Sequence, residues 1–495
     1  MYEVIIGKEV VMESFFESFT NTFHSIGAGL EAVTTAANDA ISTYILIGLL
    51  ILGGLYFTFR TKFVQFRFLK AQFQAVTEKP KDKKGVSSFQ ALMVSTASRV
   101  GTGNIIGVSS AICLGGFGSI FWMWVIAIIG AASAFIESTL AQIYKKRGED
   151  GRSYGGPAYY IEGGLKSRVI AIIFSVLLIL TYGVGFNMLA SYNLQSTFAV
   201  YDFYKEGTTP LIIGLILAVL VGICLFGGGK RLISVTSFLV PIMGTAYILV
   251  ALLITMFNIT SLPGIFARIF TDAFDFNAIF GGFTGSCLMY GIRRGLFSNE
   301  AGVGSAPNAS ASADVEHPAK QGLVQVLSVF IDTLLVCSAT AFMCVCSGVE
   351  PAKGIEGAPY VQMAISKSLG EFGPIFITVA MVLFAFTTLI GNLYYVEQGI
   401  YHLGKKEASR KLKTVYYICA CLVILIGALL ESKVLWNIAD IMMAAMTIIN
   451  IPVILILSKY AVNALKDYEQ KRKSGKTIAF KAKDIDLPDK VDYWQ

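Results

Sequence analysis

The sequence predicts an all-α integral membrane protein with about eleven transmembrane helices. Of its 495 residues, 55% are hydrophobic and only 15% are charged, and the mean hydropathy is +0.64. A soluble chain carries charge on about a quarter of its residues. A membrane-spanning helix needs about 20 apolar residues, and the chain offers about eleven such stretches. Two of these stretches contain glycines and polar residues where lipid would normally demand an unbroken helix.

The apolar stretches give the expected spans, whose ends are uncertain by a few residues. They are 41–60, 86–114, 116–145, 167–197, 210–227, 231–257, 277–304, 318–347, 372–402, 414–430 and 434–458. The chain then divides into seven parts. These are an extracellular amphipathic segment at 1–40, an extra N-terminal transmembrane helix at 41–62, a basic cytoplasmic loop at 63–85, a five-helix unit at 86–258, an extracellular connector at 259–276, a second five-helix unit at 277–458 and a cytoplasmic tail at 459–495.

The basic residues of the loops orient these spans. If all eleven spans are real, the clusters at 60–84, 145–147, 230–231, 405–413 and 471–473 fall on one side of the membrane, and the opposite loops are mixed or acidic. Positive loops face the cytoplasm. We therefore expect a multi-pass plasma-membrane protein with its N-terminus outside and its C-terminus in the cytoplasm.

The first interruption lies in the second expected span. Arg99 and Val100 are followed by Gly101, Thr102, Gly103 and Asn104. Glycine costs about 1 kcal/mol in a helix interior, and irregular backbone survives at membrane depth only inside protein or beside water. A broken helix exposes N–H groups that suit a carboxylate and carbonyl groups that suit a cation. The alternative is that the glycines only allow close helix packing, which leaves the neighbouring Arg99 and Asn104 unexplained.

The second interruption is expected between Gly291 and Gly304. Arg293, Arg294 and Glu300 are charges that need partners or water at this depth. We expect them to form an ion-pair gate at the cytoplasmic rim rather than to touch substrate. The better candidates for the substrate pocket are Phe297, Ser298 and Asn299.

The two interruptions occupy matching places in an inverted repeat. Without the span at 41–60, ten spans remain, and the interruptions fall in the first and the sixth of them. These two spans enter the membrane from opposite sides. Paired broken helices in inverted halves indicate the binding site of a secondary transporter.

Two further polar features lie inside expected spans. Thr387 and Thr388 lie in the middle of the ninth span and either bond to their own helix or hold a cation. Asp332 on the eighth span is a proton relay, a Na⁺-site charge or a hydrogen-bonded structural carboxylate.

Composition and motifs disfavour the other function classes. An enzyme would need a catalytic His, Cys or carboxylate pair at the cavity, whereas the three histidines lie near span ends or outside. The chain has no Walker A motif for ATP. A channel would need a continuous polar pore, whereas the few polar residues within the spans cluster at the two interruptions. The net charge of +7 is a signal of membrane orientation and does not indicate nucleic-acid binding. We expect no enzymatic activity and no cofactor.

Four segments resemble the alanine/glycine:cation symporter family, the sodium:alanine symporter type. They are residues 101–105, 155–160, 295–307 and 329–337, and the resemblance extends from about 40 to 465. The run Phe-Ser-Asn-Glu-Ala-Gly at 297–302 is the most specific part. The resemblance implies the LeuT-type fold, a 5+5 inverted repeat with two broken helices plus one extra N-terminal span. It also implies uptake of a small neutral amino acid such as alanine or glycine, coupled to Na⁺ or H⁺.

The resemblance also implies roles for individual residues. The backbone N–H groups of Thr102 and Gly103 would bind the substrate carboxylate, and Asn104 would help to coordinate a cation. The carbonyl of Val100, with Thr387 or Thr388, would form a second cation site.

One position departs from the family pattern. The fourth span of many members carries Asn-Met-x-Gln, but Ala190 stands at the glutamine position after Asn187 and Met188. A smaller residue would leave room for a larger substrate side chain. Alanine, glycine, serine and glutamine therefore remain open as substrates.

Overall fold

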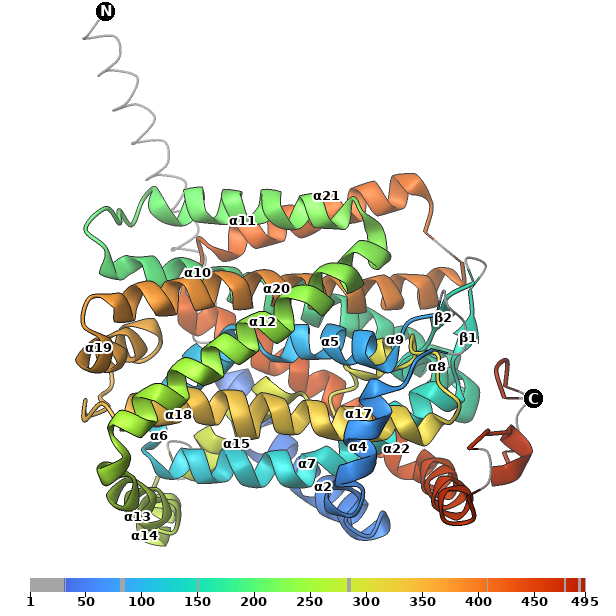
Figure 1. Cartoon of the computed structure of the whole chain (residues 1–495). Helices are drawn as coiled ribbons and strands as arrows, with labels where there is room; N and C mark the ends of the chain where they lie inside the picture. The colour runs from blue at the N-terminus through green and yellow to red at the C-terminus, as the bar shows by residue number, and fades with distance from the viewer. Residues whose placement is uncertain are drawn as a thin grey trace, which may run out of the picture.

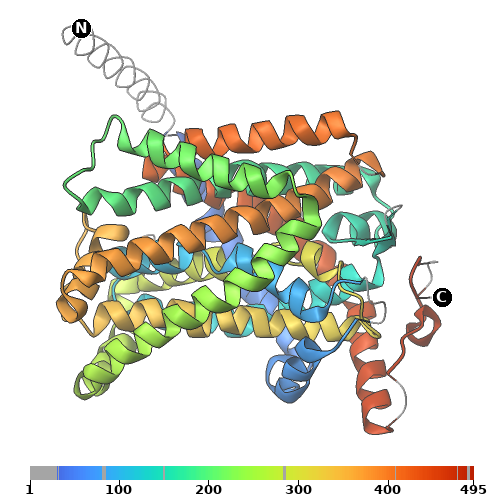
Figure 2. The same ribbon diagram turned by 45° about the horizontal axis from the view of Figure 1, so that its top comes forward.

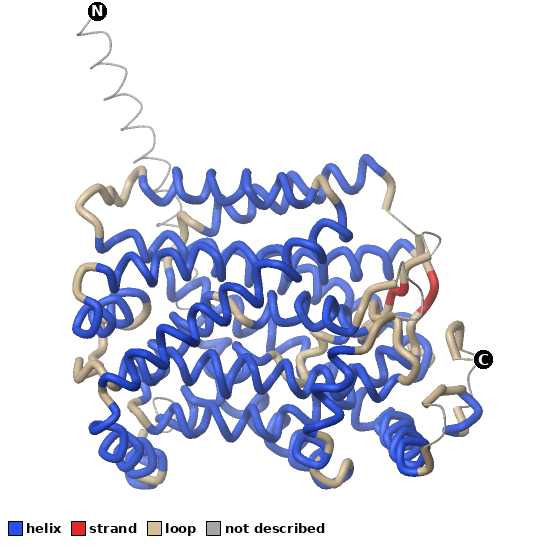
Figure 3. The backbone as a smooth tube through the Cα atoms, in the orientation of Figure 1, coloured by secondary structure: helices blue, strands red, loops and turns tan. Residues whose placement is uncertain are grey.

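The computed structural model describes residues 31, 33–80, 85–148, 151–282, 286–406, 408–475, 478–487 and 491–494. The expected amphipathic segment at 1–40 lies almost entirely outside these residues. Helices account for nearly all of the described structure, and the only strands within it form one small hairpin at the end of the bundle (Figures 1 and 3). In this hairpin, β1 (Lys146–Arg147) pairs antiparallel with β2 (Ser153–Tyr154).

The helices follow the expected order of spans. The N-terminal part contains η1 (Ile41–Leu46), α2 (Ile47–Arg60), α3 (Val64–Arg67) and α4 (Leu69–Thr77). The next part contains α5 (Ser88–Arg99), η2 (Gly103–Gly107), α6 (Val108–Gly115), α7 (Gly118–Ile143), α8 (Pro157–Gly164), α9 (Arg168–Leu180), η3 (Thr181–Gly185), α10 (Phe186–Ser196), η4 (Thr197–Val200), α11 (Thr209–Leu225) and α12 (Gly228–Phe257).

The remaining helices form the connector and the second half. They are η5 (Ile259–Ser261), α13 (Leu262–Ala273), α14 (Phe276–Gly281), α15 (Cys287–Asn299), α16 (Pro307–Ser310), α17 (Pro318–Val329), η7 (Phe330–Cys337), α18 (Ser338–Val345), α19 (Ala358–Leu369), α20 (Phe372–Gly404), α21 (Arg410–Gly427), α22 (Ser432–Lys473) and η8 (Ala482–Ile485). Each expected span therefore corresponds to a helix or to a chain of helical pieces.

Length and composition support a membrane location. Six helical segments of the described chain are long and apolar enough to cross a bilayer, and three shorter apolar helices accompany them. The most apolar window of α12 is only 28% buried, and its exposed side includes Phe238, Leu249 and Leu253. Water would not tolerate such a surface over a whole helix, but lipid does.

The basic loops gather at one end of the bundle, as the charge pattern predicts. Figure 1 shows α4, the β1–β2 hairpin and the segment after α22 at this end, which we call the basic end. The turn from α11 into α12 also lies there, and Lys230 and Arg231 belong to the first turn of α12. The opposite end holds α13, α14 and α19 in both views (Figures 1 and 2).

The two interrupted spans run in opposite directions. The chain enters α5 from the basic end and leaves α6 at the opposite end, whereas α15 begins at the opposite end and α17 starts back from the basic end (Figure 1). α7 packs against α15 and α17. This antiparallel arrangement is the one expected for an inverted repeat.

The second interruption lies later than the sequence predicts. α15 is a regular helix through Gly291 and Gly295 as far as Asn299, and the irregular backbone occupies residues 300–306. A Cβ atom at Gly291 would lie 2.5 Å from the Ser119 carbonyl oxygen, and one at Gly295 would lie 2.6 Å from Ile126. These two glycines therefore permit close packing of α15 on α7 and do not break the helix.

Candidate substrate and cation site

The first break is a short turn stabilised by its own asparagine. α5 ends at Arg99, Val100 has ψ 88°, and π-helical turns begin at Gly103. The N–H of Gly101 donates to Asn104 Oδ1 at 2.8 Å, and the N–H of Asn104 donates to the Gly101 carbonyl at 3.1 Å. Asn104 thus pairs a backbone group that the break would otherwise leave unsatisfied.

Gly101 lies directly against the middle of α20. A Cβ atom at Gly101 would be only 2.0 Å from Thr388 Oγ1. This hydroxyl is buried and has no hydrogen-bond partner among the described residues. An unpaired buried hydroxyl costs about 1–3 kcal/mol. It therefore represents an oxygen that is available to a ligand at the first break.

The adjacent Thr387 is already hydrogen-bonded. Its hydroxyl donates to the carbonyl oxygens of Leu383 at 2.9 Å and Phe384 at 3.2 Å, in the preceding turn of α20. This is the usual back-bond of a helical threonine. The two neighbouring threonines therefore differ in what they can offer to a cation.

A second group of oxygens surrounds Asn104 on its other side. Asn104 Nδ2 donates to Asp332 Oδ1 at 2.7 Å and to Ser298 Oγ at 2.9 Å. Asp332 Oδ2 accepts from Ser298 Oγ and from Thr333 Oγ1, both at 2.7 Å. The first break, α15 and η7 meet in this buried cluster, which contains one carboxylate.

An aromatic wall faces Gly103. A Cβ atom at Gly103 would lie 2.9 Å from two carbons of the Phe297 ring. The centroid of Phe297 is 4.6 Å from that of Phe186 and 4.8 Å from that of Trp436. This wall limits the volume beside the backbone of the first break.

α10 touches the first break from another direction. Asn193 Nδ2 donates to Thr102 Oγ1 at 3.0 Å, and Asn187 Oδ1 accepts from Asn392 Nδ2 at 3.0 Å. Ala190 lies one turn from each of these asparagines and is 1% exposed. Residues spaced by three along a helix lie near one face, so Ala190 lies on the side of α10 that approaches the break.

The second break is longer and is hydrogen-bonded from neighbouring helices. Glu300, Gly302 and Gly304 all have positive φ. The N–H of Gly302 donates to Glu137 Oε1 at 3.3 Å, and Asn450 Nδ2 donates to the Gly302 carbonyl and to Glu137 Oε2, each at 2.9 Å. α7 and α22 thereby fix the backbone of this break.

The comparisons with known proteins agree with this geometry. The sequence pattern of the sodium:alanine symporter family matches residues 28–482. The chain belongs to this family. It is therefore a secondary transporter and not an enzyme.

Relatives in the family cover nearly the whole chain. The chain is 44% identical to the amino-acid carrier protein AlsT of Bacillus subtilis, over 98% of this chain and 99% of that protein. It is 44% identical to the probable sodium/glutamine symporter GlnT of the same organism, over 91% and 93%. It is 35% identical to the sodium/alanine symporter AgcS of Methanococcus maripaludis, over 89% and 98%.

Solved structures show weaker likeness. MhsT in complex with L-phenylalanine has a TM-score of 0.48 and 16% identity, and covers 84% of this chain and 94% of that one. A Na⁺-coupled sialic acid symporter has a TM-score of 0.45 and 13% identity, and covers 87% and 86%.

The structure brings most of the residues expected at the family's site together. Gly101, Gly103 and Asn104 of the first break meet Ser298 and Phe297 of α15. Thr388 reaches the break, whereas Thr387 turns back to its own helix. Asn299 lies in a different contact, because its Oδ1 accepts from the N–H of Ala301 at 3.0 Å and so supports the second break.

The charged residues expected to form a gate lie at two different places along the interrupted span. Arg293 and Arg294 lie in α15 before the break, on the side away from the basic end, and both pair with the buried Asp440 at 3.0 and 3.3 Å. Glu300 lies in the break itself and accepts from Ser305 Oγ at 2.7 Å.

Sequence reasoning did not identify the residues that hold the second break. Glu137 and Asn450 are isolated polar residues within apolar spans, which is the signal that could have found them. Arg99 is 2% exposed, and its Nη1 donates to Gln325 Oε1 at 2.9 Å. Its positive charge acts on the carboxylates of Glu137, Glu300 and Asp332.

Proposed function

We propose that this chain imports a small neutral amino acid by Na⁺-coupled symport through alternating access. The observation that carries the proposal is the unpaired, buried Thr388 hydroxyl, which lies against Gly101 at the first break. Hard cations prefer oxygen ligands. The close approach at Gly101 places this hydroxyl directly at the break.

The substrate carboxylate would bind at the N-terminal end of η2. The N–H groups of Thr102 and Gly103 lie at this end, where a helix offers free donors and the positive end of its dipole. The absent side chain at Gly103 lets the Phe297 ring pack directly against this backbone. The Phe297 ring and the aromatic residues beside it would surround a short apolar side chain, which favours alanine or glycine.

Two cation positions fit the oxygens nearby. One would use the carbonyl of Val100 with Thr388 Oγ1. The other would use Asn104, Ser298 and Asp332, where the carboxylate compensates the positive charge. Arg294 and Glu300 have partners elsewhere, so we assign them to structural ion pairing and hydrogen bonding and not to the ligands.

Proton coupling and glutamine transport are the alternatives. Asp332 is a buried carboxylate at the break that could carry a proton. The relative GlnT is named a probable sodium/glutamine symporter, and Ala190 would leave space for a longer substrate. The basic end would face the cytoplasm, which puts the N-terminus outside and the C-terminus inside a plasma membrane.

Uptake into proteoliposomes tests this function. We expect labelled alanine and glycine to accumulate with an inward Na⁺ gradient and not with K⁺ or choline, and unlabelled serine and glutamine to report the substrate range by competition. Equal uptake in all three salts, unaffected by a proton ionophore, would contradict cation coupling. Uptake that follows an imposed pH gradient without Na⁺ would instead establish the proton alternative.

A further inference from the structure

A cavity of about 520 Å³ opens at the basic end, away from the two breaks. Its walls come from the end of α7 with β1, from α8, from the start of α9, from the end of α20 and from the last described residues. The volume lies within the range of about 300–1,000 Å³ that is typical of small-molecule sites. Neither transport nor the fold accounts for a chamber of this size here.

Positive charge dominates the lining of this cavity. Six basic residues line it, namely Lys145, Lys146, Arg147, Lys166, Arg168 and Lys405. The acidic lining residues are Glu162 and Asp492, so the formal excess is six minus two, or four positive charges. Such an excess in a concave site attracts multiply charged anions.

The nearer carboxylate is already shared among several cations. Glu162 pairs with Arg168 at 2.6 Å and with Lys405 at 3.4 Å, and it lies 2.9 Å from His402 Nε2. Burial raises the pKa of this carboxyl, but the hydrogen bonds from Arg168 and His402 outweigh it and hold the pKa below its ordinary value. The ionised Glu162 therefore neutralises positive charge beside Arg168 and Lys405. Within the described chain, the basic residues of β1 are not paired with it.

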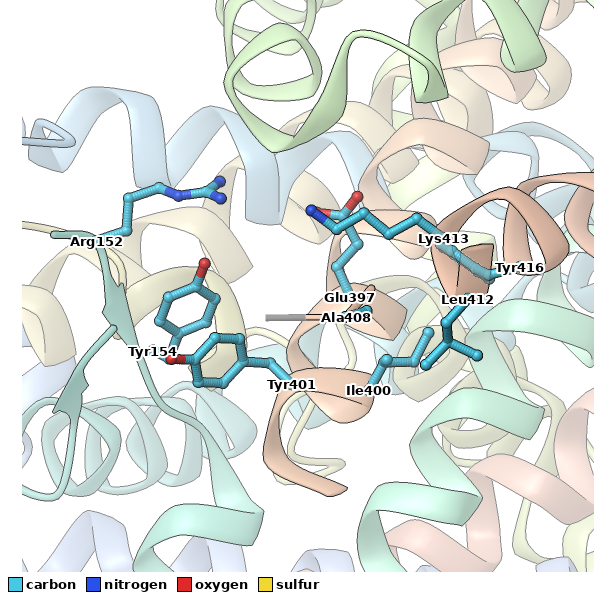
Figure 4. A pocket seen from close by; sticks show the side chains of 9 residues that line it. All are labelled: Arg152, Tyr154, Glu397, Ile400, Tyr401, Ala408, Leu412, Lys413 and Tyr416. Atoms are coloured by element: carbon cyan, nitrogen blue, oxygen red, sulfur yellow. The ribbon is translucent and has the colours of Figure 1, made fainter. Parts of the chain in front are cut away.

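The aromatic walls are fixed in place. Tyr401 stacks on Tyr154 with ring centroids 3.7 Å apart, which joins the hairpin to the end of α20 (Figure 4). Glu397, one turn earlier on α20, extends toward Lys413 (Figure 4) and is not part of the lining. The negative charge of Glu397 thus belongs to a neighbouring region.

One hydroxyl of the lining lacks a partner. Tyr159 is 7% exposed, and its hydroxyl has no hydrogen bond within the described residues. Its ring packs edge-on against His402 at 4.9 Å, which holds it at the cavity wall. A buried donor at the edge of a cationic cavity is what an anionic oxygen would satisfy.

We propose that this cavity binds the phosphate group of an anionic ligand. A phosphate carries up to two negative charges and several acceptor oxygens, which matches the charge excess, the arginines and the tyrosine hydroxyl together. The positive-inside rule depends only on how many basic residues a loop carries. It does not require these residues to enclose a cavity. Basic pockets at the cytoplasmic surface of membrane proteins are suited to lipid head groups.

The phosphate has two chemical sources, which the test must separate. Lipid-facing residues begin directly after Arg168, since Val169 is 67% exposed and Ile173 is 46% exposed. An anionic lipid head group could therefore reach the cavity from the bilayer. A soluble phosphate could reach it from the aqueous side.

The experiment measures binding to the purified full-length protein in detergent. Phosphatidylglycerol, phosphatidylcholine and inorganic phosphate are titrated separately, with native mass spectrometry and the melting temperature as readouts. The test variant Lys146→Gln/Arg147→Gln/Lys166→Gln removes three charges from the lining. The control variant Arg410→Gln/Lys411→Gln/Lys466→Gln removes three exposed charges from outside it. Tyr159→Phe is a milder variant that removes only the hydroxyl.

We expect saturable binding that the test variant weakens at least tenfold, that Tyr159→Phe weakens severalfold, and that the control changes less than twofold. Binding of phosphatidylglycerol alone identifies a head group as the source, and competition by inorganic phosphate identifies a soluble one. Absence of saturable binding of either probe overturns the proposal. Equal losses in the test and control variants also overturn it, because they indicate diffuse surface charge.

Discussion

The two broken helices solve the same backbone problem in different ways. The first break is short, is capped by its own Asn104, and leaves the Thr388 hydroxyl of the neighbouring helix unpaired. The second break is longer, uses three positive-φ residues, and is hydrogen-bonded from α7 and α22. An unpaired oxygen can serve a ligand, whereas a satisfied network mainly maintains shape. We therefore expect ligand binding chiefly at the first break and a structural role chiefly for the second.

The largest effect is expected from Gly101→Ala. The new Cβ atom would lie 2.0 Å from Thr388 Oγ1, so either the break or α20 must move. Overpacking costs about 1–3 kcal/mol, and 1.4 kcal/mol is about tenfold in affinity. We expect Na⁺-driven uptake to fall below about a tenth of the wild-type rate. Gly244→Ala in α12 is the control, since a Cβ atom there meets nothing within 4 Å. Normal uptake by Gly101→Ala would mean that the close approach is not needed for function.

At the second break, we expect Glu137→Ala to lower the thermal stability of the protein. Glu137→Ala would leave the N–H of Gly302 without its acceptor, and Asn450 Nδ2 would keep only its bond to the Gly302 carbonyl. Each such loss costs about 1–3 kcal/mol, so we expect a clear fall in the melting temperature in detergent. Glu137→Gln keeps one acceptor oxygen and should lose less. An unchanged melting temperature in Glu137→Ala would contradict the structural role that we assign to this break.

The same contrast explains which parts the sequence could predict. The break at Gly101 was found because glycine, a hydroxyl and an amide cluster within an apolar span. The predicted second break begins too early, because Gly291 and Gly295 carry the same signal for another reason, namely the packing of α15 on α7. A glycine in a sequence does not reveal whether it serves a close contact or a change of backbone direction.

Contacts between residues that lie far apart in the sequence could not be predicted either. Glu137 contacts Asn450 across 313 positions, and Asn104 contacts Asp332 across 228. All four are polar residues within apolar spans, and nothing in the sequence shows which of them meet. The direction of the two threonines was likewise open, because adjacent helical residues point about 100° apart.

An intermediate effect is expected from Thr388→Ala, which tests the ligand role of the first break. The change removes one oxygen from the proposed cation position but little volume. Hydrogen bonds and ligands to charged groups are worth about 1.5–3 kcal/mol, so we expect the half-saturating Na⁺ concentration to rise roughly tenfold. Alanine affinity at saturating Na⁺ should change less, because linkage transmits only part of the effect. An unchanged Na⁺ dependence would move the cation elsewhere.

The smallest effect is expected from Thr387→Ala, the neighbouring substitution. The Thr387 hydroxyl already donates to the carbonyl oxygens of Leu383 and Phe384, and both carbonyls belong to its own helix. Its loss costs little, since such back-bonds do not stabilise a helix and slightly strain it. We therefore expect the half-saturating Na⁺ concentration to stay within about twofold of wild type, because a change below 0.5 kcal/mol is at most about that size. Measuring both variants in one vesicle preparation makes Thr387→Ala the matched control for Thr388→Ala. If Thr387→Ala shifts the Na⁺ dependence more than Thr388→Ala does, α20 presents the other threonine to the cation. The contrast between an unpaired and a paired hydroxyl would then not identify the ligand at this break.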